Sequence, residues 1–200
     1  MTRTIGIYVF DNVEVLDFAG PYEVFTCAAR VSGAAPFQVR TIAATLAPLR
    51  ARAGLALQPE ADFASAGKID VLIVPGGVVT AELAKPEVIA WIGAMARDCE
   101  LVASVCTGAF LLAQAGLLDG RDATTHWEDL ADLRTAYPAL TVRGERRWID
   151  TGDIVTSGGI SAGIDMSLHL VERLAGRELA VRTARQMEYD WNEARNDGAT

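Results

Sequence analysis

One stretch near the middle of the chain, residues 101–116, constrains the fold more than any other. It begins with the apolar, partly β-branched run Leu101–Val105, passes through Cys106, and continues as an Ala- and Leu-rich segment that ends near Gly116. The first half predicts a buried strand and the second half a helix. Gly108 fits this interpretation, because a residue without Cβ lets the new helix pass close to the sheet. A strand that turns at once into a helix is typical of α/β proteins.

Cys106 stands at the junction of this predicted strand and helix. Free N–H groups and the positive end of the helix dipole favour thiolate over thiol at such a place. We therefore expect Cys106 to be a nucleophile with a lowered pKa. The alternative is a buried structural cysteine, since free cysteines are among the most buried residues.

Strand and helix patterns alternate from end to end, without a linker rich in Pro or Ser and without an internal repeat. Strands are expected at 5–10, 37–43, 68–74, 101–105 and 123–127, hairpins at 49–57 and 147–156, and helices from Pro21 to Arg30 and at 86–98, 108–116, 128–137, 163–175 and 178–189. This order predicts one α/β domain over residues 1–200 with a mainly parallel sheet. Ligands of such sheets bind at the carboxyl ends of the strands.

Two glycine-rich turns follow predicted buried strands. Gly76 and Gly77 come after the strand at 68–74, and Ser157-Gly158-Gly159 follows the second arm of the later hairpin. Backbone N–H groups at Gly76 and Gly77 can face a ligand and build an oxyanion hole without side chains. An ordinary glycine turn is the alternative there. Both turns and Cys106 are expected at the same edge of the sheet.

Asp17 lies in apolar surroundings between Leu16 and Phe18, just before the helix expected to start at Pro21. Desolvation favours the neutral form of such a carboxyl, which can then donate a proton. The alternative is that Asp17 only caps the loop before the helix. Both interpretations remain open.

The sequence contains two histidines, His126 and His169, and only His126 is a candidate site residue. His126 ends a predicted strand near the level of Cys106, so it fits either a Cys–His pair or, beside Trp127, a hydrogen-bonded core histidine. Residues 159–163 match the G-x-S-x-G pattern of serine hydrolases, but His169 lies on the same predicted helix and not on a separate loop. We therefore interpret His169 as a packed helix residue and expect no serine catalysis.

Composition excludes several classes of function. Lys and Arg number 18 against 26 Asp and Glu, which leaves a net charge of −8 and argues against a nucleic-acid partner. Two histidines and no ligand cluster argue against a metal, and the absence of a Walker loop or G-x-G-x-x-G argues against a nucleotide cofactor.

The expected location is the cytoplasm, with no membrane contact. Residues 1–4 run directly into a strand pattern without a signal peptide, and no apolar run is long enough to span a bilayer. Cys27, Cys99 and Cys106 are an odd number of cysteines, which fits a reducing compartment. Cys27 and Cys99 lie on or beside helices and are expected to be structural.

Four motifs resemble those of the DJ-1/PfpI superfamily in order and context, across nearly the whole chain. They are Pro75-Gly76-Gly77, Cys106-Thr107-Gly108, Thr124-Thr125-His126-Trp127 and Thr156-Ser157-Gly158-Gly159. Residues 16–21 and 106–113 are most similar to the bacterial isonitrile hydratase branch, and also to the amino-terminal domain of AraC-type regulators. The resemblance implies a flavodoxin-like three-layer sandwich, of the class I glutamine amidotransferase-like type, that forms a homodimer.

For the isonitrile hydratase branch, the resemblance also implies a cofactor-free addition of water to a small isonitrile, which gives an N-substituted formamide. It makes Cys106 the nucleophile, Asp17 the proton relay and Thr107 an assisting residue. Backbone N–H groups near Gly76, Gly77 and Gly108 would stabilise developing charge.

Two positions differ from the motifs of other branches of this superfamily and argue against the activities of those branches. PfpI-like proteases carry His directly after the cysteine, where this chain has Thr107. DJ-1-like members use a glutamate where this chain offers Asp17, with Glu23 as the only nearby rival. The alternative function is a ligand-sensing or thiol redox-sensing module. Because the sequence ends at Thr200 after one expected domain, we expect no DNA binding.

Overall fold

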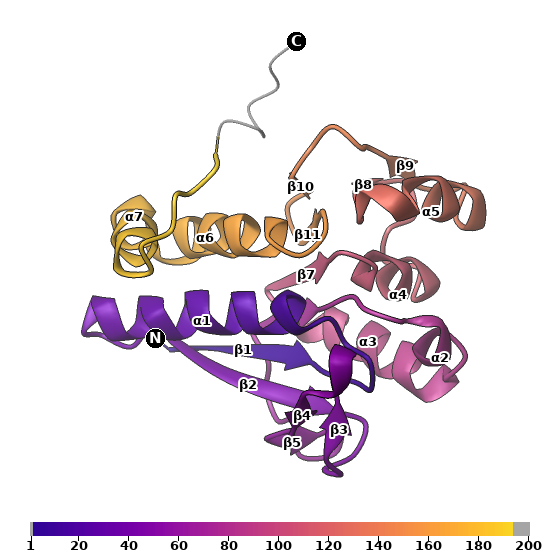
Figure 1. Ribbon diagram of the computed structural model, residues 1–200, viewed down its shortest axis with the longest axis horizontal. Helices are drawn as coiled ribbons and strands as arrows, with labels where there is room; N and C mark the ends of the chain where they lie inside the picture. The colour runs from indigo at the N-terminus through magenta and orange to yellow at the C-terminus, as the bar shows by residue number, and fades with distance from the viewer. Residues whose placement is uncertain (1, 194–200) are drawn as a thin grey trace.

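A computed structural model describes residues 2–193, and its fold is an α/β sandwich (Figure 1). The strands are β1 (Arg3–Tyr8), β2 (Phe37–Ala43), β3 (Leu49–Arg50), β4 (Ala56–Leu57), β5 (Ala61–Asp62), β6 (Val71–Val74), β7 (Leu101–Val105), β8 (Asp122–Ala123), β9 (Thr141–Val142), β10 (Trp148–Asp150) and β11 (Ile154–Ser157). The helices are α1 (Val15–Ser32), α2 (Thr80–Leu83), α3 (Pro86–Asp98), α4 (Gly108–Gln114), α5 (Leu130–Ala136), α6 (Ala162–Ala175) and α7 (Arg177–Gln186), with 3-10 turns at Arg52–Gly54 and Trp127–Asp129.

In the described part of the chain, the main sheet has the order β10-β11-β7-β6-β1-β2-β5. All neighbouring strands are parallel except β10, which pairs with β11 as an antiparallel hairpin. Two small ladders, β3 with β4 and β8 with β9, lie outside this sheet. The expected α/β fold with a mainly parallel sheet is confirmed.

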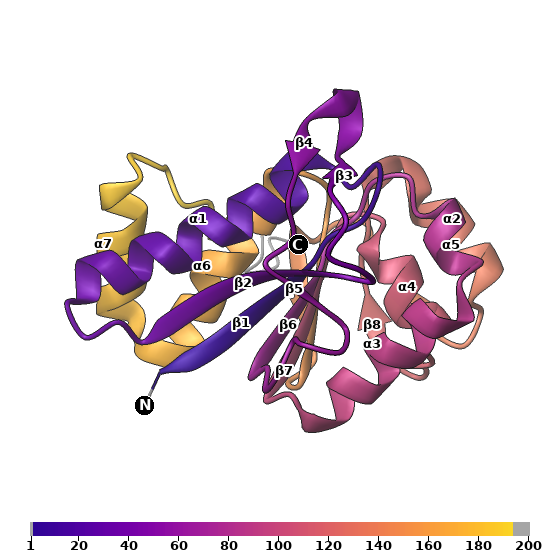
Figure 2. The ribbon, with the colours of Figure 1, turned by 90° about the horizontal axis from the view of Figure 1, so that it is seen from below.

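Helices cover both faces of the sheet. Figure 2 shows α1, α6 and α7 on one side and α2, α3 and α4 on the other. Strands β6 and β7 are buried along their whole length, as expected for parallel strands covered on both faces. Because β1, β6, β7 and β11 run parallel, their carboxyl ends meet at one edge, where α1 begins.

Most element boundaries agree with the sequence patterns. Strand β2 and helix α3 have the predicted limits, and both predicted hairpins form. The short elements α2, β5 and β9 were not predicted, because two to four residues are too few to show a period. Residues 190–200, which follow the last predicted helix, lie mostly outside the described residues.

The predicted start of the first helix at Pro21 is wrong. Helix α1 begins at Val15, so Pro21 is inside it and Asp17 is in its first turn. Proline removes the helical hydrogen bond to the carbonyl of residue 17 but does not end the helix. The helix continues because its apolar face, with Val24 and Phe25 fully buried, packs against the core.

No helix within residues 2–193 has the length and apolar character needed to cross a membrane. The cytoplasmic location and the single-domain organisation of residues 1–200 stay predictions.

Candidate functional site

Cys106 forms a sharp elbow between β7 and α4. Its backbone φ is +57°, a left-handed conformation that is uncommon for a residue with a side chain. The Cys106 N–H donates to the carbonyl oxygens of Ser157 and Gly158, both at 3.2 Å, which ties the elbow to the end of β11. A Cβ at Gly108 would lie 2.0 Å from the Val74 carbonyl oxygen, so only glycine permits the helix to start this close to the sheet. The predicted strand–cysteine–helix junction is confirmed.

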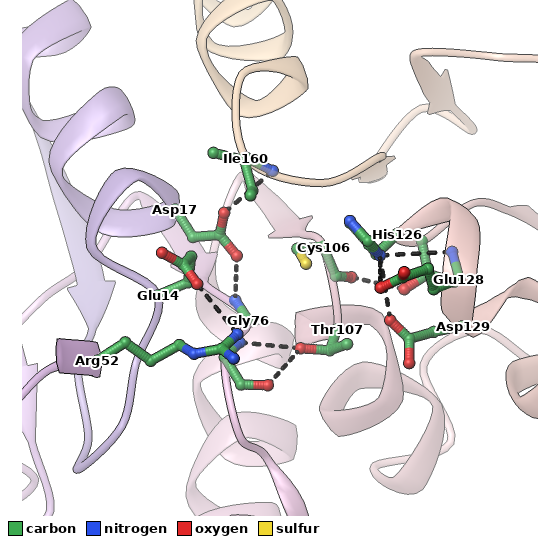
Figure 3. Close-up of polar contacts among 12 residues, drawn as sticks. Glu14, Asp17, Arg52, Gly76, Cys106, Thr107, His126, Glu128, Asp129 and Ile160 are labelled. Carbon is green, nitrogen blue, oxygen red and sulfur yellow. Dashed lines mark hydrogen bonds and ion pairs between the residues drawn. The ribbon is translucent and has the colours of Figure 1, made fainter.

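Asp17 faces this elbow from the first turn of α1 (Figure 3). Its side chain is wholly buried. One carboxyl oxygen, Oδ2, accepts the Gly76 N–H at 3.1 Å, and the other, Oδ1, accepts the Ile160 N–H at 3.2 Å. The Cys106 thiol is a further hydrogen-bond partner of this carboxyl. Three segments far apart in sequence therefore meet at Asp17.

Burial raises the pKa of Asp17 to about 7, and the nearby Glu14 carboxylate adds to the rise. Hydrogen bonds from Gly76, Cys106 and Ile160 oppose it, because they stabilise the charged form. Asp17 thus titrates near neutral pH, in the direction expected from its apolar neighbours. A carboxyl of this kind can accept and donate a proton during one reaction.

The expectation of a lowered pKa for Cys106 is wrong. Burial raises the pKa of the thiol to about 12, and the charge of Asp17 adds to the rise. The Thr107 N–H at the start of α4 lowers the pKa of Cys106, as expected for a helix N-terminus, but this effect is smaller than the first two. The resting sulfur is therefore a thiol held against a carboxyl that can take its proton.

Thr107 links the cysteine elbow to the glycine turn after β6. Its hydroxyl donates to the Gly77 carbonyl oxygen and accepts the Gly77 N–H, each at 2.9 Å. A Cβ at Gly76 would lie 2.6 Å from the Thr107 N, and one at Gly77 would lie 2.3 Å from the Asn12 carbonyl oxygen. Both glycines are thus required for close packing, and their N–H groups hold Asp17 and Thr107 in this structure.

His126 approaches the site from the side of β8, and in Figure 3 Cys106 lies between Asp17 and His126. The neighbouring Thr125 hydroxyl donates to the Cys106 carbonyl oxygen at 2.8 Å. The His126 ring packs over Gly159, where a Cβ would lie 2.1 Å from ring atom Cδ2. Trp127 does not bury the histidine as expected, because it lies in a 3-10 turn and is 72% exposed.

Two carboxylates lie beside the His126 ring on its outer side. Its Nδ1 accepts the Glu128 N–H at 3.4 Å, and it lies 3.8 Å from Glu128 Oε2 and 3.5 Å from Asp129 Oδ2. The ring is thus half-buried between the site and these carboxylates, and neither sequence interpretation of His126 describes this position fully.

Sequence reasoning missed two features of the site. Ile160 supplies a backbone N–H to Asp17, and nothing in its side chain indicates this contact. Glu14 lies one turn before Asp17 and pairs with Arg52 from the β3–β4 hairpin, with 3.2 Å between Oε2 and Nη1 (Figure 3). Nothing in the local sequence predicted either contact.

The other singled-out residues lie elsewhere. Ser161 follows Ile160, while His169 lies two turns along α6 and pairs through Nε2 with Asp150 Oδ2 at 2.7 Å. Cys27 is buried, and Cys99 is partly buried with its thiol 3.4 Å from the Ile69 carbonyl oxygen. Burial raises the pKa of Cys99 to about 11.

Residues 3–173 match the model of the DJ-1/PfpI family. The chain belongs to the DJ-1/PfpI family. Among curated proteins, the chain is 37% identical over 190 residues to the isonitrile hydratase of Pseudomonas putida. The match covers 94% of this chain and 79% of that protein. Among solved structures it is similar to a ThiJ/PfpI family protein from Pseudomonas syringae, with a TM-score of 0.86, 28% identity, and 100% of this chain and 80% of that one covered.

A second kind of relative is regulatory. The HTH-type transcriptional regulator GbdR of Pseudomonas aeruginosa is 34% identical over 188 residues, which cover 94% of this chain and 51% of the regulator. The chain thus spans about half the length of that relative. Membership of the family alone does not separate an enzyme from a regulatory module.

Proposed function

We propose that this protein is an isonitrile hydratase, which adds water to an isonitrile and releases an N-substituted formamide. The observation that carries the proposal is the buried Asp17 carboxyl, held by two backbone N–H groups against the Cys106 thiol. Its similarity to an isonitrile hydratase over most of both chains supports the same activity.

In the first step, the Cys106 sulfur attacks the terminal carbon of the isonitrile. The thiol proton passes to the Asp17 carboxylate as the S–C bond forms, so no free thiolate is needed despite the raised pKa of Cys106. Asp17 then gives this proton to the same carbon. The product is a thioimidate, R–N=CH–S, and Asp17 is again a carboxylate.

In the second step, water attacks the thioimidate carbon while Asp17 accepts one of its protons. The C–S bond breaks as nitrogen is protonated, and R–NH–CHO leaves. One water proton ends on nitrogen and the other restores the Cys106 thiol. The overall reaction consumes one isonitrile and one water, and it needs neither a metal nor an organic cofactor.

The remaining site residues support these steps in the proposal. Thr107 holds the glycine turn through its hydroxyl, and the N–H groups of Thr107 and Gly108 at the start of α4 stabilise negative charge near the sulfur. Gly76 and Gly77 hold Asp17 and Thr107. His126 borders the opposite side of the site and is a candidate contact for the substrate.

The decisive experiment is to incubate purified protein with cyclohexyl isonitrile and measure N-cyclohexylformamide by mass spectrometry. We expect turnover by the wild type, none by Cys106→Ala, and a loss of about 100-fold or more in Asp17→Asn, the range for removal of a general acid–base group. Cys99→Ala is the matched control, since it removes a thiol outside the site. Equal turnover by wild type and Cys106→Ala would refute the proposal.

A ligand-sensing role is the second candidate, favoured by the similarity to GbdR. In that case the wild type would bind an isonitrile or another small molecule saturably and form no product. A thiol redox sensor fits less well, because burial and Asp17 raise the pKa of Cys106, whereas rapid oxidation requires thiolate.

We also propose that the protein forms a homodimer that covers part of the site. Three large apolar side chains next to site residues are at least one-third exposed, namely Leu16, Val78 and Ile160. Apolar side chains gathered in this way are typical of a protein interface. Light scattering after size-exclusion chromatography would give the mass, and a monomer at micromolar concentration would exclude a stable dimer.

A further inference from the structure

The loop of residues 158–161, between β11 and α6, holds one oxygen of Asp17. The contact is a backbone one, from the Ile160 N–H to Asp17 Oδ1. Ile160 has a φ of +55°, which is unfavourable for a β-branched residue and costs on the order of 1–3 kcal/mol. The surrounding structure must therefore hold this loop in place.

Arg147, which comes directly before β10, contacts the loop at two points. Its carbonyl oxygen accepts the Gly158 N–H at 2.8 Å. Its guanidinium Nη2 donates to the Ser161 Oγ at 3.5 Å. One arginine thus contacts the residues on both sides of the strained segment.

Arg147 is itself held by Asp165 from the first turn of α6. The Asp165 side chain is wholly buried, and its Oδ2 forms a close ion pair with Arg147 Nη2. Breaking a buried ion pair by removing one charge is strongly unfavourable, because the other charge is left without a partner in a poorly solvated place. The position of the guanidinium therefore depends on this carboxylate.

The segment after α7 packs onto the same carboxylate. The Asn192 N–H donates to Asp165 Oδ1 at 2.9 Å, and the Trp191 indole Nε1 donates to the Asp165 carbonyl oxygen at 3.2 Å. Burial and the Asp165 carboxylate raise the pKa of Tyr189 to about 12, so this tyrosine remains a neutral neighbour. The far end of the described chain is thereby connected to the loop at the site.

We propose that Arg147 is a positioning residue that presents the Ile160 N–H to Asp17, and that Asp165 and residues 189–192 hold Arg147 in place for that purpose. The inference deepens the proposed function and rests on it, because Asp17 is there the group that moves the proton. It assigns a role to a buried ion pair that touches neither Cys106 nor Asp17 directly.

If the loop moves, the Ile160 N–H no longer donates to Asp17, and a hydrogen bond that stabilises the Asp17 carboxylate is lost. The pKa of Asp17 will then be higher. The other groups that face Asp17 are Glu14 on its own helix and the Cys106 thiol at the elbow, and Glu14 is paired with Arg52 from the β3–β4 hairpin. None of these contacts involves Asp165, so we expect the shift to arise from the loop.

The test is the pH profile of Cys106 alkylation by iodoacetamide, followed by mass spectrometry of the peptide that contains Cys106. This readout needs no isonitrile turnover, so it can succeed or fail independently of the proposed function. We expect the alkylation rate of the wild type to rise with pH through a midpoint that is absent in Asp17→Asn. In Asp165→Asn we expect this midpoint to lie about one pH unit higher. Trp191→Phe, which loses one hydrogen bond but keeps an aromatic ring, will shift it in the same direction by less.

Asp150→Asn is the matched control, because it removes a carboxylate that joins the same hairpin and helix through Arg173 and His169 but lies away from the loop. It will lower the melting temperature and leave the midpoint unchanged. An Asp165→Asn protein that melts earlier yet keeps the wild-type midpoint would show a merely structural role and overturn the proposal. If Asp165→Asn does not fold, an unchanged midpoint in Trp191→Phe overturns it instead.

Discussion

The Asp17 carboxyl raises the pKa of the Cys106 thiol, while the hydrogen bond from that thiol lowers the pKa of Asp17. Above about pH 7 the pair therefore holds one proton, which rests on the sulfur, beside a carboxylate that can accept it. Burial is the largest cause of the raised pKa of both groups, because each charged form is poorly solvated there. A nucleophile of this kind is activated by its neighbour at the moment of attack.

The rate of formamide formation will rise with pH through about 7. Below that pH Asp17 is protonated and cannot accept the thiol proton, so kcat/KM will fall about tenfold for each pH unit. The measurement is kcat/KM for cyclohexyl isonitrile between pH 5 and pH 9 for wild type and Asp17→Asn. For the variant we expect only a low residual rate, without the midpoint near pH 7. A wild-type profile without an acid limb would exclude Asp17 as the acceptor.

The stability of the fold will depend on the same titration. The pKa of Asp17 is raised in the folded state from 3.8 to about 7, so its neutral form stabilises the fold below pH 4 and this contribution is lost as pH rises to 7. The free energy of unfolding of the wild type minus that of Asp17→Asn should fall over this range by up to about 4 kcal/mol. Urea unfolding at fixed pH values measures it, and a difference that grows with pH would contradict the raised pKa.

The strand and helix of the elbow were predictable from sequence, but the environment of its thiol was not. The run from Leu101 to Gln114 predicts a strand and a helix because its periodicity changes at Cys106. The direction of the pKa shift of Cys106 was wrong because burial depends on α1 and α6, which pack over the elbow from elsewhere in the chain. The Ile160 N–H contact has no local signal, since every residue except proline carries the same backbone donor.

The position of Asp17 within a helix was also not predictable from the local sequence. Pro21 predicts a helix start because proline suits a first turn, yet the apolar face of α1 extends the helix back to Val15. Tertiary packing thus overrode the local signal and placed Asp17 on a rigid helix. The apolar neighbours of Asp17 nevertheless predicted the correct direction of its pKa shift.

Substitution of Gly108 by alanine will destabilise the elbow. The added Cβ would lie 2.0 Å from the Val74 carbonyl oxygen, and because that atom is backbone at the end of a buried strand, it can move only if the sheet moves. We expect a loss of about 1–3 kcal/mol or more in the free energy of unfolding, with reduced turnover. Gly93→Ala in α3 is the control.

At Gly93 nothing lies within 4 Å of an added Cβ, so alanine should be neutral or stabilise the helix by up to about 1 kcal/mol. Thermal unfolding of both variants decides the matter. Equal melting temperatures for the two would mean that α4 can withdraw from the sheet without cost.

Glu14→Gln will move the acid limb of the pH profile to lower pH. The Glu14 carboxylate raises the pKa of Asp17, so neutralising it favours the charged form of Asp17 and lets the thiol lose its proton in more acidic solution. We expect a shift of a few tenths of a pH unit, because the Glu14 side chain is 22% exposed and already paired with Arg52. Glu23→Gln is the matched control, since Glu23 lies on the same helix and pairs with Arg30 at the surface. A shift toward higher pH in Glu14→Gln, or an equal shift in both variants, would exclude Glu14 as a residue that tunes the proton affinity of Asp17.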